Sequence, residues 1–121
     1  MPLREFPAMS HPRKALDALI HSPVRFSLLA ALRNLEDVDF RFLADLLEVS
    51  DSTLSQNLTV LADAGLVTVR KEPAGRRTRT WIGITAAGSE AFARHLTTLQ
   101  AIVDSGADRV AAAEPGRRAT T

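Results

Sequence analysis

The chain has 121 residues, of which 45% are hydrophobic and 24% are charged, and its formal net charge is +1. This length and composition are typical of one globular domain. The absence of cysteine excludes disulfides, thiolate metal sites and thiol redox switches. No apolar run approaches the ~20 residues of a membrane-spanning helix. Residues 1–10 lack the apolar core of a secretory signal, so we expect a cytoplasmic protein with no membrane partner.

The charges are unevenly distributed along the chain. Residues 34–48 contain five acidic residues and one arginine, whereas residues 66–80 contain five basic residues and one glutamate. A concentrated basic segment in a nearly neutral protein indicates where a polyanion would bind.

The first third of the sequence predicts a flexible N-terminus followed by two helices. We expect residues 1–12 to be flexible and residues 13–20 to form a short helix. Ser22 and Pro23 mark the start of the next helix, because serine caps helices and proline is tolerated at the first helical position. The buried stripe of this helix is expected to be Val24, Leu28, Leu32 and Leu35.

The middle of the sequence predicts two helices joined by a tight turn. Asp39 can cap the first of them. Its inner face would consist of Phe40, Leu43 and Leu47. Residues 48–50 are too few for anything but a turn, and Ser50 can cap a helix over residues 51–64. Gly65 then stands where a left-handed residue ends a helix. The inner face of this second helix would be Leu54, Leu58 and Leu61.

The last third predicts a β-hairpin and a final helix. Two β-rich runs, residues 66–72 and 78–84, flank a five-residue loop at 73–77. Thr85 can cap the final helix, and we expect residues 106–121 to form a disordered tail. The apolar stripe of that helix would be Phe92, Leu96, Leu99 and Val103.

The order helix, helix, turn, helix, basic hairpin, helix predicts a winged helix-turn-helix domain over residues 13–105. Two helices joined by a turn of ~3–4 residues form the helix-turn-helix pattern, and the basic hairpin after them would be the wing. The fold class is therefore mainly α with a small β-hairpin (α+β). Each half of the pattern is weak evidence alone, and the full order is much more specific.

The same segments resemble a known family. They are residues 19–25, residues 49–55, Leu58, Leu61, residues 64–67 and residues 84–88. Over residues 13–99 the chain resembles winged helix-turn-helix transcriptional regulators of the MarR and ArsR type, above all the compact single-domain members. The resemblance implies a bacterial regulator, usually a repressor, that binds specific double-stranded DNA as a homodimer. It leaves a small-molecule effector open and unidentified.

The helix over residues 51–64 is interpreted as the recognition helix that reads the major groove. Glutamine and asparagine can pair bidentately with adenine, and serine and threonine are adaptable donors and acceptors. The candidate contacts on this helix are Asp51, Ser52, Thr53, Ser55, Gln56 and Asn57.

The wing is expected to supply the phosphate contacts that the recognition helix lacks. Relatives often carry a basic residue near positions 56, 57 or 60, whereas residues 50–64 here contain no lysine or arginine. Gly75 permits a tight tip, and arginines there can reach phosphates or the minor groove. Arg25 and Arg41 are further candidates, and Trp81 is expected to be buried in the core or in an interface. The candidate wing contacts are Arg70, Lys71, Arg76, Arg77 and Arg79.

Two apolar stripes toward the chain ends predict a homodimer interface. A self-complementary pairing would give twofold symmetry and a roughly palindromic operator. The alternative is that these side chains pack within their own domain. The candidate interface residues are Leu16, Leu19, Ile20, Phe92, Leu96, Leu99 and Val103.

Two other classes of function are weighed against DNA binding. An enzyme is not expected, because the sequence has no phosphate-cradling glycine loop and no nucleophile motif. No metal or cofactor is expected, because His11, His21 and His95 do not have ligand spacing. The remaining alternative is a winged-helix protein–protein adaptor that has lost DNA binding. The absence of lysine and arginine from the recognition helix, which carries the two acids Asp51 and Asp63, favours the adaptor. The wing arginines favour DNA binding.

Overall fold

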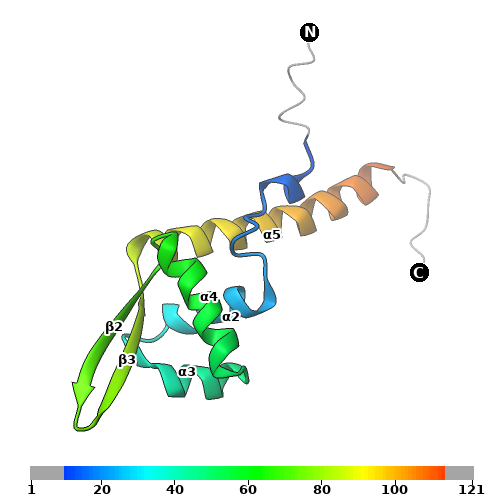
Figure 1. Cartoon of the computed structure of the whole chain (residues 1–121). Helices are drawn as coiled ribbons and strands as arrows, with labels where there is room; N and C mark the ends of the chain where they lie inside the picture. Colours follow the sequence, from blue (N-terminus) through cyan, green and yellow to red (C-terminus); the bar gives the residue numbers. More distant parts are fainter. Residues whose placement is uncertain (1–9, 114–121) are drawn as a thin grey trace. The chain divides into compact units, whose positions relative to one another are not determined.

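The computed structural model describes residues 10–113, with side chains up to residue 106 (Figure 1). The chain divides into two compact units. One unit is residues 17–94, and the other contains, of the described residues, 10–16 and 95–113. The last helix, α5 (Ala86–Ala113), contributes residues to both units. No helix of the described part is long and apolar enough to cross a membrane.

The unit of residues 17–94 has the predicted winged helix-turn-helix architecture, which confirms the α+β fold class. Its three antiparallel strands lie in the order β1-β3-β2, and β2 and β3 form the wing (Figure 1). The elements, in chain order, are α2 (Pro23–Arg33), β1 (Val38–Asp39), α3 (Phe40–Leu47), α4 (Asp51–Asp63), β2 (Val67–Ala74), β3 (Arg77–Ile84) and the start of α5.

Three of the four predicted helix caps are confirmed. Ser22, Ser50 and Thr85 each accept a hydrogen bond on the side-chain oxygen from a backbone N–H in the first turn of the helix that follows, at 3.3, 3.1 and 2.9 Å. Asp39 occupies the N-cap position of α3 but makes no such bond. Its carboxylate pairs instead with Arg79 of the wing, so the prediction of a side-chain cap by Asp39 is wrong.

The turn between α3 and α4 is as short as predicted. It consists of residues 48–50, and Glu48 has a left-handed backbone with φ of 56°. Gly65, which was expected to end α4 in that conformation, has φ of 78°. The two helices of the helix-turn-helix are therefore joined by three residues.

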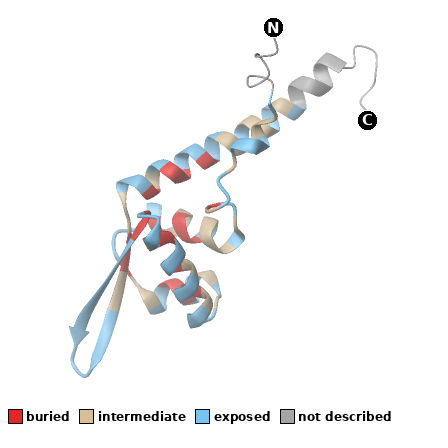
Figure 2. Ribbon diagram, turned by 45° about the horizontal axis from the view of Figure 1, so that its top comes forward, coloured by how far each residue is buried: buried red, intermediate tan, exposed pale blue. Residues whose placement is uncertain are grey.

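The hydrophobic core lies inside this unit, where its helices meet the base of the sheet (Figure 2). The inward-facing leucines predicted for α4 are buried there. Leu35 is an exception to the prediction for α2, because it lies beyond Arg33, the last residue of that helix, and is 40% exposed. The core consists of Ile20, Leu28, Leu29, Leu32, Val38, Leu43, Ala44, Leu54, Leu58, Leu61, Leu66, Val67, Ile82, Ala91 and Phe92.

The wing is longer and its tip is tighter than the sequence predicted. The pairing of β2 and β3 continues to Ala74 and Arg77, which leaves a two-residue turn in place of the five-residue loop. Gly75, with φ of 67°, provides the left-handed residue that this turn needs. Pro73 lies within β2, where it is tolerated because β2 is an edge strand of the sheet.

The start of α5 packs tightly against the start of the wing. The Thr85 N–H donates to the Leu66 carbonyl oxygen at 3.0 Å. A Cβ on Gly88 would collide with that same carbonyl oxygen. Only glycine fits at position 88 without displacing the backbone, which gives a physical reason for the glycine that ends the segment 84–88.

The other unit departs from the sequence prediction at both ends. The helix expected over residues 13–20 is only a short 3₁₀ helix, η2 (Pro12–Ala15). It stops because the Asp17 carboxylate accepts a hydrogen bond from the Leu19 N–H at 2.9 Å, which favours a turn. At the other end α5 continues to Ala113, so residues 106–113 do not belong to a disordered tail. The rest of that tail and residues 1–9 of the flexible N-terminus lie outside the described residues.

Candidate nucleic-acid interface

The outer face of α4 is polar and carries no lysine or arginine. Ser52, Ser55 and Gln56 are exposed. Within the described part of the chain, their side chains make no hydrogen bond. Thr53 is half-buried, and its hydroxyl accepts a hydrogen bond from the Ser50 hydroxyl at 3.0 Å. Of the six residues predicted on this helix, Ser52, Ser55 and Gln56 are therefore the ones whose donors and acceptors are available to a ligand.

Asn57 is held inside the fold by both ends of its amide. Its Oδ1 accepts from Arg25 Nη1 at 2.9 Å, and its Nδ2 donates to the Thr53 carbonyl oxygen at 2.8 Å. Arg25 Nε also donates to the Leu19 carbonyl oxygen. Asn57 and Arg25 thus fix α4 against α2, so these bonds give both side chains a structural role.

Asp51 lies at the start of α4, where its carboxylate faces a basic side chain. Arg41 of α3 is 3.5 Å away, and the two side chains are 67% (Arg41) and 59% (Asp51) exposed. An ionised carboxylate only accepts hydrogen bonds and repels phosphate. Asp51 therefore orients Arg41, and its negative charge is favourable at the positive end of the helix dipole. It does not provide a phosphate contact.

Arg70 of β2 is the most strongly paired cation of the wing. Its guanidinium contacts Asp37 at 3.1 Å and Glu72 at 2.9 Å. Hydrogen bonds to Asp37 and Glu72 raise the pKa of Arg70 above its ordinary value. Two carboxylates offset its single charge, so this predicted phosphate contact has little positive charge left for DNA.

Arg79 of β3 is committed to a second cluster, whose members come from all three strands of the sheet. Its Nε lies 3.7 Å from the Asp39 carboxylate, and its guanidinium lies over the Trp81 ring at 5.1 Å from the centroid. Trp81 Nε1 donates to Glu72 at 3.2 Å. Trp81 is half-buried on the sheet beneath a cation and lies outside the core, so the expectation of core burial is wrong, whereas burial in an interface stays a prediction.

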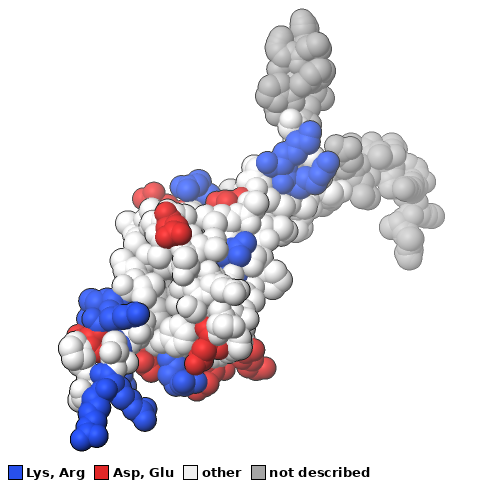
Figure 3. All heavy atoms as spheres, viewed as in Figure 1, with Lys and Arg blue, Asp and Glu red and all other residues white. Residues whose placement is uncertain are grey.

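The remaining cations of the wing are exposed and make no ion pair within the described residues. They are Lys71 and, at the tip, Arg76 and Arg77. Figure 3 shows Lys and Arg gathered at the end of the molecule that carries the wing. Of the five basic residues predicted to contact phosphate, three are thus available and two serve the internal structure of the sheet.

A groove separates α4 from one face of the wing. It encloses about 410 Å³ and is lined on the helix by Ser55 and Thr59 and on the wing by Val69, Lys71 and Thr80, among others. The polar face of α4 and one free cation of the wing therefore border the same groove.

Residues 24–103 match the model of a family described as winged helix DNA-binding domain. The chain belongs to this winged-helix family. An uncharacterized protein of Methanocaldococcus jannaschii is 33% identical over 78 residues, which cover 64% of this chain and 85% of the relative.

Solved structures of transcriptional regulators have the same winged-helix fold. A transcriptional regulator homologue from Pyrococcus horikoshii OT3 has a TM-score of 0.71 at 27% identity and covers 82% of this chain and 96% of its own. A MarR-family regulator from Silicibacter pomeroyi has a TM-score of 0.57 at 28% identity, with coverages of 85% and 67%. The chain is a winged-helix DNA-binding protein and is similar to transcriptional regulators, one of them of the MarR family. Its family and fold are those of regulators and not of enzymes.

The residues predicted to form a dimer interface divide into three groups in this winged-helix protein. Ile20 is fully buried, and Phe92 is 4% exposed and stacks on Phe26 with ring centroids 4.9 Å apart. These two side chains hold the core together and are not available to a second copy. Leu96 and Val103 of α5 are 40% and 63% exposed. The other three, which are half-buried, are Leu16, Leu19 and Leu99.

Proposed function

We propose that this winged-helix protein is a sequence-specific repressor that divides DNA binding between two surfaces. Ser52, Ser55 and Gln56 of α4 would contact base edges in the major groove, and the free cations of the wing would hold phosphates. The observation that carries the proposal is that Lys71, Arg76 and Arg77 of the wing make no ion pair within the described residues, and that Lys71 borders the same groove as α4.

This division follows from the chemistry of the two surfaces. Phosphate contacts supply affinity without sequence information, whereas hydrogen bonds to base edges supply specificity. A helix without lysine or arginine adds little to non-specific binding, so its polar face is suited to reading sequence. Occupation of a promoter by such a protein in the cytoplasm would block transcription, which is the reason for proposing repression.

Gln56→Ala is expected to relax sequence preference at one base pair. The amide of Gln56 can pair bidentately with adenine, and its loss would cost about 1–3 kcal/mol at that position. Selection of bound duplexes from a random library, carried out with the wild-type protein and with the variant, measures the effect. Gln100→Ala on α5 is the matched control, and it should leave the selected site unchanged. An unchanged site with Gln56→Ala would remove this residue from base reading.

The alternative function is a protein–protein adaptor of the same fold. Phe42 and Leu46, one turn apart on α3, are 49% and 50% exposed, which is the kind of apolar surface that a protein partner covers. An adaptor has no need of free cations at the wing tip, so the wing favours DNA. Failure of the wild-type protein to bind any duplex at low salt would favour the adaptor.

We further propose that the protein binds DNA as a homodimer through the exposed apolar residues of α5. Two linked copies make the second half-site contact intramolecular and so raise the affinity of a weakly basic reader. Replacing Leu96 and Val103 together by aspartate is expected to give a folded monomer with much weaker DNA binding. Light scattering at micromolar concentration measures the oligomeric state, and the operator should have half-sites about 10–10.5 base pairs apart.

The control for this variant places the same two charges on exposed positions of the same helix that lie off the apolar stripe. Ala93→Asp with Thr97→Asp alters exposed side chains and should leave the dimer intact. A wild-type protein that is monomeric at micromolar concentration would refute the homodimer.

A further inference from the structure

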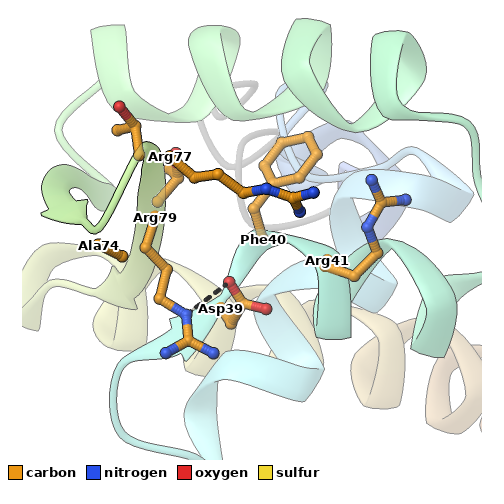
Figure 4. A pocket seen from close by; sticks show the side chains of 8 residues that line it. Asp39, Phe40, Arg41, Ala74, Arg77 and Arg79 are labelled. Atoms are coloured by element: carbon orange, nitrogen blue, oxygen red, sulfur yellow. Dashed lines mark ion pairs between the residues drawn. The ribbon is translucent and has the colours of Figure 1, made fainter.

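A second cavity lies between the start of α3 and the tip half of the wing. It encloses about 440 Å³ (Figure 4). Three arginines, Arg41, Arg77 and Arg79, and one carboxylate, Asp39, line it. The lining therefore has an excess of positive charge. The cavity adjoins the groove that faces α4, because Phe40 and Thr80 line both.

The ion pairs around this cavity leave two arginines available. Asp39 pairs with Arg79 at 3.7 Å, and Figure 4 shows this pair. Arg77 has no carboxylate partner among the described residues. Among the residues that the structure describes, Arg41 pairs only with Asp51, which does not line the cavity, and both side chains are more than half exposed. A surface pair of this kind is weak, so Arg41 can accept an additional anionic partner.

The fold brings these two arginines to the same hollow. Arg77 is the first residue of β3 and pairs with Ala74 across the wing. Arg41 lies in the first turn of α3, directly after β1, and β1 pairs with β3 through Asp39 and Trp81. In Figure 4 the Arg77 side chain extends across the cavity toward Phe40 and Arg41, whereas Arg79 turns toward Asp39.

We infer that Arg41 and Arg77 together bind one backbone phosphate of DNA. Guanidinium groups present planar pairs of donors that match phosphate oxygens, and two of them can share one phosphodiester without a carboxylate between them. The inference rests on the proposed function and adds to it a contact that joins the helix-turn-helix to the wing. It also assigns Arg77 to the DNA backbone. Arg76 is then the remaining cation, in the turn at the wing tip.

The test is a double-mutant cycle of Arg41→Gln and Arg77→Gln in the full chain. Affinity for a duplex is measured by fluorescence anisotropy over a range of salt concentrations. Each single variant is expected to bind roughly ten-fold more weakly. Because both substitutions remove contacts to the same phosphate, the affinity of the double variant should fall clearly less than 100-fold, which is the product of the two single effects. Its slope of log affinity against log salt should fall by about 0.9 per protomer.

A matched control removes one arginine charge elsewhere in the same unit. Arg94→Gln on α5 alters an exposed side chain and measures the general effect of losing one positive charge. A single variant no weaker than this control would overturn the inference. The inference would also be overturned if the affinity of the double variant fell by the full product of the two single effects and its salt slope fell by about 1.8. Two separate phosphates would then be involved.

Inorganic phosphate distinguishes a DNA phosphate from a free anion at this site. At equal ionic strength, low-millimolar phosphate is expected to release no more DNA than chloride does. Release by micromolar phosphate would assign the cavity to a free anion and overturn the inference. If the wild-type protein binds no duplex at all, the proposed function itself fails, an outcome distinct from independent effects of the two arginines.

Discussion

Replacing Arg76 and Arg77 together with glutamine is expected to weaken binding to all DNA sequences by about 100-fold at ~0.1 M salt. These two residues are the free cations at the wing tip, whereas Arg70 and Arg79 are paired with carboxylates. The slope of log affinity against log salt should fall by about 1 to 2 per protomer, because phosphate contacts release counterions. Fluorescence anisotropy with a selected site and with a random duplex measures both quantities.

The control for this variant loses the same charge on another surface. Arg13→Gln with Arg94→Gln changes two exposed arginines of η2 and α5 and should weaken binding far less. If the Arg76 and Arg77 variant retains wild-type affinity and salt dependence, the wing does not take part in DNA binding. A loss confined to one DNA sequence would show that the wing reads bases and not the backbone.

Leu54→Ala is expected to lower the free energy of unfolding by about 2–5 kcal/mol. Leu54 is fully buried in the first turn of α4, so its truncation leaves a cavity under the helix face that carries Ser52, Ser55 and Gln56. Urea unfolding followed by circular dichroism measures the change. DNA affinity should fall in parallel, because the recognition helix loses its support.

Val60→Ala is the matched control on the same helix. Val60 is 38% exposed, and alanine has the higher helix propensity, so the change should stay below about 1 kcal/mol. Equal stability of the two variants would contradict the assignment of Leu54 to the core.

The helix-turn-helix could be predicted from sequence because its signals are local. Ser50, the leucines of α4 and Gly65 each act within a few residues of their position in the chain. The β-hairpin of the wing was predicted, but the length of its turn was not. Pro73 suggested a loop, whereas an edge strand tolerates proline. The end of α5 was missed because an alanine-rich segment fits a helix as well as a tail.

The division of the wing cations could not be predicted, because it depends on contacts between distant segments. The acidic segment 34–48 and the basic segment 66–80 meet where β1 pairs with β3, so Asp37 reaches Arg70 and Asp39 reaches Arg79. β1 is only two residues long and leaves no periodic pattern in the sequence. The opposite charges of the two segments were the available signal, and they could have suggested this pairing.

The central claim is that the polar face of α4 reads base sequence while the wing holds the DNA backbone. Selection of bound duplexes from a random library by the wild-type protein, followed by sequencing, tests it most directly. We expect one enriched site with two related half-sites, and the Arg76 and Arg77 variant should recover the same site at lower salt. Recovery of the input sequence distribution by the wild-type protein at about 50 mM salt, where phosphate contacts are strong, would contradict the claim.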